Sequence, residues 1–134
     1  MRILIVDDCI DSSRLLIKYL SPLGECDVAT DGGGAVAAVR SALDKNQPYD
    51  LILLDIVMPN MDGHKALQEI RKLEESKNGQ FADGTKIVMV TALSDIRNVI
   101  KSFKGLCDAY LLKPFDKNLL LVKLEELGLT STIN

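Results

Sequence analysis

Apolar residues in this chain form short continuous runs that alternate with segments in which they recur at helical spacing. A continuous apolar run of about 4–8 residues, such as RILIV near the start of the chain, is typical of a strand buried on both faces. We interpret five runs as strands, at residues 2–6, 26–30, 51–55, 86–90 and 109–112. Apolar residues recur every three or four positions in five other segments, at 15–23, 36–43, 66–73, 96–103 and 120–127. This second pattern predicts five amphipathic helices.

The regular alternation of strand and helix predicts an α/β fold, in which a parallel sheet carries helices on both faces. Capping residues agree with these elements. Asp11, Ser12 or Ser13 can cap the first helix, and Gly105 and Gly128 can end the fourth and the fifth.

Length and composition indicate one domain, because 134 residues with 47% apolar content suffice for a single core. We expect the domain to span 1–128 and 129–134 to be a short tail, without an output domain. The segment 74–86 is polar and contains glycine, so we expect a surface link that is longer than the usual connection of about 2–6 residues.

Charge and cysteine content exclude several classes of function. The net charge of -3 argues against direct binding of nucleic acid, which requires clustered cations. No apolar run reaches the roughly 20 residues of a membrane span, and no secretory leader opens the chain. Three cysteines without CxxC spacing, and a single histidine (His64, expected to be exposed), favour neither a zinc site nor a disulfide framework. We therefore expect a cytoplasmic protein with reduced thiols.

Polar side chains follow four of the five predicted strands, where each strand ends. Asp7 and Asp8 follow the first, Asp55 ends the third, Thr91 follows the fourth and Lys113 the fifth. If these strands are neighbours, the side chains converge on the rim where open α/β sheets bind ligands. Clustered carboxylates repel one another unless a cation joins them, and an all-oxygen cluster suits Mg²⁺. Each residue alone would more often be a turn former or a surface charge, but their conjunction predicts a site.

Four short motifs extend this pattern: VDD at 6–8, LLDIVMPNMDG at 53–63, VTA at 90–92 and KPF at 113–115. In this order and spacing, they make the chain resemble the receiver domain of two-component response regulators over about residues 2–127. The resemblance implies a flavodoxin-like (βα)5 fold with the strand order 2-1-3-4-5.

The resemblance also assigns roles to individual residues. It implies that Asp55 accepts a phosphoryl group and that Lys113 contacts this group. It also implies that Mg²⁺ is held by Asp7, Asp8, Asp55 and the backbone carbonyl of Val57. Thr91 and Tyr110 would form the switch, and the Lys113–Pro114 peptide would be cis.

The function implied is that of a regulatory protein rather than an enzyme with a separate substrate. A histidine kinase or a histidine phosphotransfer protein would supply the phosphoryl group. The expected output surface consists of the helix near 96–103, the strand near 109–112 and the helix near 120–127, and it would bind a partner protein. The alternative is a phosphate shuttle or sink without a switched output.

Three other functions are less well supported. Residues 32–37 match the G-x-G-x-x-A pattern of dinucleotide-binding proteins, but they follow the second strand, at the sheet edge. A phosphatase of the haloacid-dehalogenase type needs a second aspartate two residues after the nucleophile, where this chain has Cys9 or Val57. A degenerate receiver would lack part of the acidic set, which is complete in this sequence.

Overall fold

The computed structural model describes residues 1–55, 63–78, 84–92, 94 and 96–130. In this part of the chain, strands and helices alternate throughout. The strands are β1 (Arg2–Val6), β2 (Glu25–Ala29), β3 (Leu51–Asp55), β4 (Lys86–Ala92) and β5 (Ala109–Lys113). The helices are α1 (Ile10–Leu20), α2 (Gly32–Asp44), α3 (Gly63–Asn78), α4 (Ile96–Phe103) and α5 (Lys117–Glu126).

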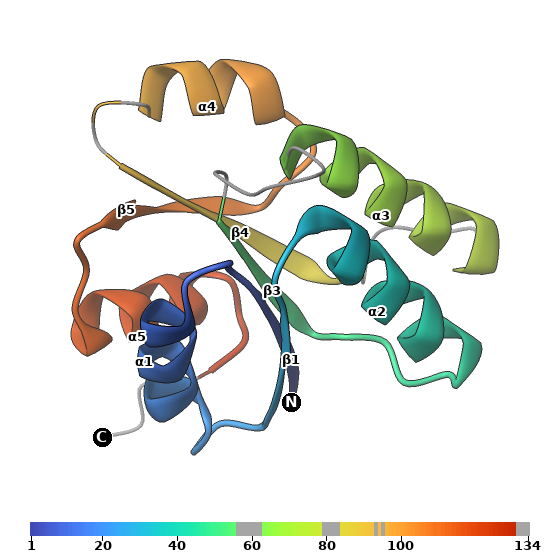
Figure 1. The fold of residues 1–134 in the computed structure, drawn as a ribbon, viewed down its shortest axis with the longest axis horizontal. Helices are drawn as coiled ribbons and strands as arrows, with labels where there is room; N and C mark the ends of the chain where they lie inside the picture. Colours follow the sequence, from blue (N-terminus) through green and yellow to red (C-terminus); the bar gives the residue numbers. More distant parts are fainter. Residues whose placement is uncertain (56–62, 79–83, 93, 95, 131–134) are drawn as a thin grey trace.

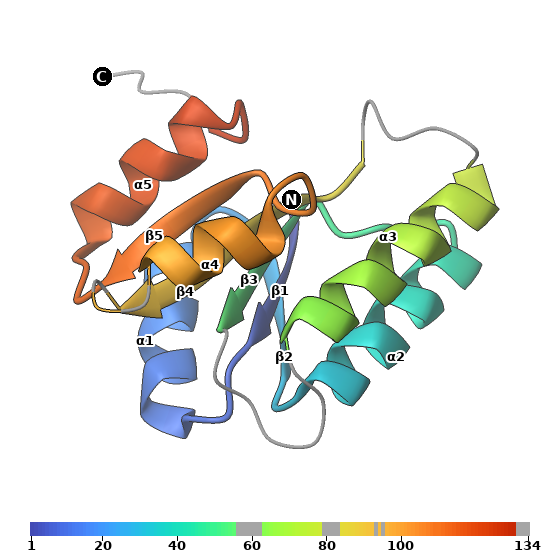
Figure 2. The same ribbon diagram turned by 90° about the horizontal axis from the view of Figure 1, so that it is seen from above.

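The strands of the ribbon in Figure 1 form one parallel sheet in the order β2-β1-β3-β4-β5, which can be followed in Figure 2. This is the order that the resemblance implied, so the predicted fold class is confirmed. Because the strands are parallel, the carboxyl ends of β1, β3, β4 and β5 lie at the same rim of the sheet. The cis peptide bond between Lys113 and Pro114 is also present.

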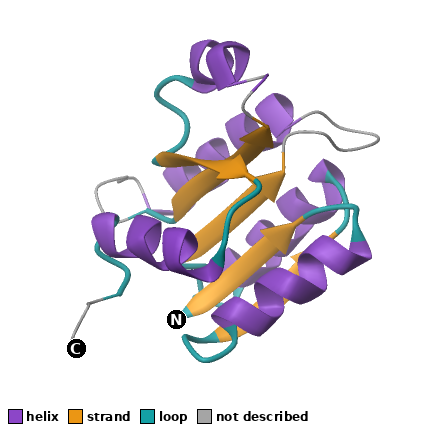
Figure 3. Cartoon of the chain, turned by 90° about the vertical axis from the view of Figure 1, so that its left-hand side faces the viewer, coloured by secondary structure: helices purple, strands orange, loops and turns teal. Residues whose placement is uncertain are grey.

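Helices cover both faces of the sheet and bury two separate hydrophobic clusters (Figures 2 and 3). α2, α3 and α4 pack on one face, where Val39, Leu67 and Phe103 are buried. α1 and α5 pack on the other, around Leu20 and Leu124. β1, β3 and β4 are buried on both sides because each contributes alternate residues to the two clusters, whereas β2, at the edge of the sheet, is fully buried only at Ala29. Among the described residues, no helix is both long enough and apolar enough to cross a membrane.

The predicted helix boundaries were partly wrong. The N-cap of α1 is Cys9, whose side chain makes no capping hydrogen bond, whereas Asp11, Ser12 and Ser13 lie inside the helix. Instead, the Cys9 carbonyl accepts a backbone hydrogen bond from Ser13 at 3.0 Å. Gly105 and Gly128 adopt positive φ angles of 82° and 78° after α4 and α5, as a helix end favours.

The link predicted at 74–86 was also partly wrong, because α3 continues to Asn78. Glu74 is buried on this helix, so the segment begins inside the packed structure and not on a loop. Residues 79–83 lie outside the described part of the chain. His64, expected to be exposed, is half-buried, and its ring lies 5.3 Å from that of Phe103.

Candidate functional site

Asp7 occupies the turn that leads from β1 into α1. Its backbone N–H donates to the Ala29 carbonyl at 3.0 Å, which extends the pairing of β1 with β2 by one residue. Its carboxylate oxygen Oδ1 accepts the backbone N–H of Cys9 at 2.9 Å. Asp7 is only 4% exposed, whereas its neighbour Asp8 is exposed. The turn therefore holds one acidic side chain inside the rim and leaves the next one outside.

Asp55 and Lys113 meet at the same rim although β4 separates their strands. Asp55 is the last residue of the buried strand β3, and Lys113 is the last residue of β5. The Lys113 side chain reaches past the end of β4, so that its Nζ donates to Oδ2 of Asp55 at 2.6 Å. The carboxylate is largely buried while the lysine side chain is 41% exposed, so the ion pair lies at the solvent boundary of the rim.

The electrostatics of the rim couple these three side chains. Burial raises the pKa of Asp7, and the negative charges of Asp55 and Asp8 raise it further, against the hydrogen bond from Cys9 and the positive charge of Lys113. Burial by itself lowers the pKa of Lys113, but the hydrogen bond to Asp55 and the charges of Asp55 and Asp7 outweigh it and raise that pKa. The cluster thus holds more negative charge than one ammonium group compensates.

Thr91 and Tyr110 belong to the other face of the sheet. Side chains alternate along β4, where Met89 packs with α2, α3 and α4, and Val90 packs with α1 and α5. Thr91 lies two residues after Met89 and therefore faces the same side of the sheet. Tyr110 pairs with Met89 across the two strands and packs against the same hydrophobic cluster. Thr91 is 5% exposed, and its hydroxyl donates to the Ala92 carbonyl at 3.5 Å. The two residues expected to form a switch therefore share one face, opposite α1 and α5.

A cavity of about 420 Å³ opens beside the rim, on the α1 and α5 face. Asp7 and Lys113 form its polar end, and the remaining lining residues are Ser12, Leu15, Leu16, Val90, Pro114 and Phe115. Leu15 is 45% exposed, although its spacing predicted a buried position on α1. No pattern in the sequence indicates this cavity directly, because α1 and the segment that follows β5 are far apart along the chain.

The donor set at the rim suits a hard cation in part. Asp7 and Asp55 provide buried carboxylate oxygens whose mutual repulsion a cation would relieve. Asp8 is exposed, and no three His, Cys, Asp or Glu side chains of the described residues are arranged to hold a metal ion. Val57, whose carbonyl the sequence suggested as a ligand, lies outside the described residues.

Comparison with known proteins identifies the family. The family model for the response regulator receiver domain matches residues 3–125. The regulatory protein VanRB of Enterococcus faecalis is 35% identical over 128 residues, which are 95% of this chain and 52% of that protein. The chemotaxis protein CheY of Halobacterium salinarum is 33% identical over 116 residues, 87% of each chain. The chain spans about half the length of VanRB and of other curated relatives.

Solved structures agree with this assignment. The chemotaxis response regulator CheY4 of Vibrio cholerae superimposes with a TM-score of 0.76 and 28% sequence identity, covering 94% of this chain and 97% of that one. The residues that the family model matches include the polar residues at the strand ends, from Asp7 to Lys113. The chain therefore belongs to the response regulator receiver domain family of two-component signalling proteins.

Proposed function

We propose that Asp55 accepts a phosphoryl group from a histidine kinase or a histidine phosphotransfer protein, and that this modification switches the binding of a partner protein. The observation that carries the proposal is the contact between Asp55 and Lys113, at 2.6 Å, with the buried Asp7 at the same rim. A carboxylate nucleophile is thus held next to a cation that can receive the charge of an incoming phosphoryl group.

The proposed reaction is an in-line displacement at phosphorus. A carboxylate oxygen of Asp55 attacks while the bond between phosphorus and the donor imidazole breaks, and the imidazole leaves with that electron pair. The product is an acyl phosphate on Asp55, and attack by water returns the free carboxylate and inorganic phosphate. Lys113 already donates to Asp55 at 2.6 Å, so its ammonium group would transfer that hydrogen bond to a phosphoryl oxygen.

We assign Mg²⁺ as the cofactor of this site, held by Asp7, Asp8 and Asp55. When bound, Mg²⁺ supplies positive charge that offsets repulsion between the carboxylates and the phosphoryl group. The raised pKa of Asp7, caused by its burial and by neighbouring negative charge, supports this assignment. The role of the Val57 carbonyl rests on the resemblance alone.

The proposed output surface consists of α4, β5 and α5. Thr91 and Tyr110 lie on one face of the sheet at adjacent strands, so a change at the hydroxyl of Thr91 has a short path to the ring of Tyr110. A phosphoryl dianion on Asp55 would draw Thr91 and Lys113 toward it, and Tyr110 would follow. The surface around Tyr110 would then bind its partner with a different affinity.

Incubation with phosphoramidate and Mg²⁺, followed by intact-mass spectrometry, tests the proposal. We expect one added phosphoryl group on the wild-type chain, none on Asp55→Asn, and none after chelation of the metal. Asp44→Asn, which changes an exposed aspartate at the end of α2, is the matched control and should be labelled normally. Label that persists in Asp55→Asn would contradict the assignment of the acceptor.

A further inference from the structure

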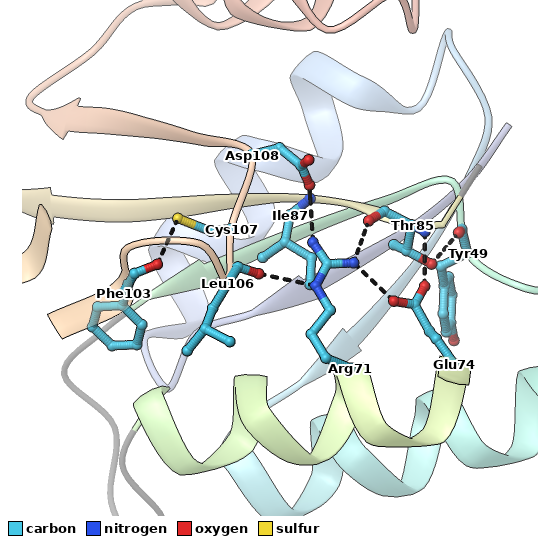
Figure 4. A network of polar contacts seen from close by, with 9 residues as sticks. All are labelled: Tyr49, Arg71, Glu74, Thr85, Ile87, Phe103, Leu106, Cys107 and Asp108. Carbon is cyan, nitrogen blue, oxygen red and sulfur yellow. Dashed lines mark hydrogen bonds and ion pairs between the residues drawn. The ribbon is translucent and has the colours of Figure 1, made fainter. Parts of the chain in front are cut away.

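Arg71 forms the centre of a polar cluster at the rim opposite the candidate site (Figure 4). Its guanidinium group donates to the Leu106 carbonyl at 2.9 Å, to the Thr85 carbonyl at 3.0 Å and to the carboxylates of Glu74 at 2.8 Å and Asp108 at 3.0 Å. These partners belong to α3 itself, to the entry into β4 and to the turn between α4 and β5. One side chain therefore joins three segments that are far apart in the sequence.

The two acidic partners of Arg71 also hold the backbone of the sheet. Glu74, 3% exposed, accepts the backbone N–H of Thr85 at 2.8 Å. Asp108 accepts the backbone N–H of Ile87 at 2.8 Å through the same oxygen that Arg71 contacts. Loss of the guanidinium group would leave a buried carboxylate without its cation, so the cluster depends on Arg71 more than on either acid.

The cluster fixes one end of α4. Leu106 and Asp108 lie in the turn after this helix, and the backbone N–H of Leu106 donates to the Phe103 carbonyl at 3.0 Å. Phe103 is the last residue of α4 and is 4% exposed. The other end of α4 begins at Ile96, five residues after Thr91. The helix is thus tied to α3 at its carboxyl end, whereas its amino end adjoins the rim that carries Asp55.

The same turn sets the position of Tyr110. Asp108 precedes Tyr110 by two residues, and its contact with Arg71 fixes the first part of β5 relative to α3. Burial raises the pKa of Tyr110 to about 12, and a hydrogen bond with Cys107 in the same turn contributes to this rise. Tyr110 packs against the same hydrophobic cluster as Leu106 and Cys107, so the ring lies on the same face as the turn that Arg71 anchors.

We propose that Arg71 is a positioning residue for the switch and acts as the pivot of α4. The inference rests on the proposed function, because it assumes that phosphorylation moves this region. Arg71 keeps the carboxyl end of α4 and the start of β5 in place, so that a change at Thr91 is converted into a defined movement of the amino end of α4 and of the Tyr110 ring. A side chain that only stabilised the fold would leave this coupling unchanged.

The experiment uses the full chain labelled with 3-fluorotyrosine, with Mg²⁺ and beryllofluoride as the phosphoryl mimic. Fluorine NMR reports the tyrosine resonances, and Tyr110→Phe identifies the one that belongs to Tyr110. In the wild type, beryllofluoride should shift this resonance while amide exchange in residues 104–108 stays unchanged. In Arg71→Met, we expect exchange in 104–108 to become roughly tenfold faster and the shift of the Tyr110 resonance to fall by roughly half or more.

Two variants make the comparison specific. Arg40→Met removes an exposed arginine from α2 and should behave as the wild type. Asp108→Asn keeps the oxygen that accepts from Arg71 and Ile87 but removes the ion pair, so it should reduce the Tyr110 shift less than Arg71→Met does. It also serves as the test variant if Arg71→Met does not fold.

The outcomes separate this inference from the proposed function. A lower melting temperature in Arg71→Met, together with an unaltered shift of the Tyr110 resonance, would show that Arg71 is only structural. If only Asp108→Asn folds, an unaltered shift of the Tyr110 resonance in that variant would lead to the same conclusion. A wild-type chain that is phosphorylated on Asp55, yet shows no response of Tyr110, would also overturn the pivot. Failure of Asp55 to accept a phosphoryl group at all would instead overturn the proposed function.

Discussion

Asp7 is 4% exposed and lies at the same rim as Asp55, so its ionised carboxylate has lost most of its water and adjoins another negative charge. Both effects raise its pKa above the ordinary value of 3.8. The folded chain therefore binds this proton more tightly than the unfolded chain does. Stability consequently falls as the pH rises from 3.8 through the raised pKa, and the cost remains in full above it.

Replacing Asp7 by Asn should therefore stabilise the metal-free chain at neutral pH. The amide is uncharged and keeps an oxygen for the backbone N–H of Cys9, so we expect a gain on the order of 1 kcal/mol. Urea unfolding at pH 7 measures it, and the same comparison at pH 3 should show little difference because Asp7 is then protonated in both states. Asp8→Asn, at the exposed neighbour, should change stability by less than about 0.5 kcal/mol. A destabilised Asp7→Asn at pH 7 would contradict this account of the rim.

The identity of the rim residues was accessible from the sequence, because a polar residue directly after a buried strand can only lie at a sheet end. The contacts between these residues were harder to predict from the sequence. Lys113 reaches Asp55 across the end of β4, and that distance depends on the twist of the sheet and the length of β5. The cluster around Arg71 had one local signal, the i,i+3 spacing of Arg71 and Glu74, since its other partners lie between 14 and 37 positions away in the sequence.

At the level of elements, the strands were easier to predict than the helix ends. The first four residues of β3, LILL, are all apolar because both faces of this strand are covered. The start of α1 depended instead on backbone geometry, with Cys9 as the N-cap although three better capping residues follow it. In the turn after β1, Asp7 accepts a hydrogen bond from the backbone N–H of Cys9, two residues further on, and the helix starts directly after this contact.

Strand alternation also gives a prediction for Thr91. Because it lies on the face of Tyr110, its hydroxyl is placed to pass a change at the rim to β5. Thr91→Ala should still acquire label on Asp55, since Asp55 and Lys113 remain, but it should lose much of the coupling to Tyr110. Such couplings typically amount to about 1–3 kcal/mol, so a loss of roughly fivefold or more is expected. The titration of the Tyr110 resonance with beryllofluoride measures it.

Thr91→Ser is the matched control for this prediction, because serine restores the hydroxyl and omits only the methyl group. It should retain most of the coupling. If serine and alanine variants behave alike, the methyl group and its packing would matter rather than the hydroxyl, and the switch would have to run by another route.

At the scale of the whole molecule, the sheet separates two rims with different properties. The rim at the strand carboxyl ends holds an excess of negative charge around Asp7 and Asp55. The partly exposed Lys113 forms an ion pair with Asp55 there. The opposite rim carries the cluster of Arg71, Glu74 and Asp108, in which each charged group has an opposite partner. The acidic side chains of the second rim and Arg71 also hold several backbone groups, through hydrogen bonds to Leu106, Thr85 and Ile87.

This asymmetry predicts where a phosphoryl mimic changes amide exchange. With beryllofluoride and Mg²⁺, protection should change at the turn carrying Asp8, from Thr91 into the start of α4, and in β5 up to Lys113. Residues 74–78 and 84–86, on the opposite rim, should exchange as before, because the Arg71 cluster holds them independently of the site. Hydrogen exchange with mass spectrometry gives this map in one experiment. Changes confined to the turns beside Asp8 and Asp55 would mean that the modification stays local, and the chain would then carry or store phosphoryl groups rather than switch a partner.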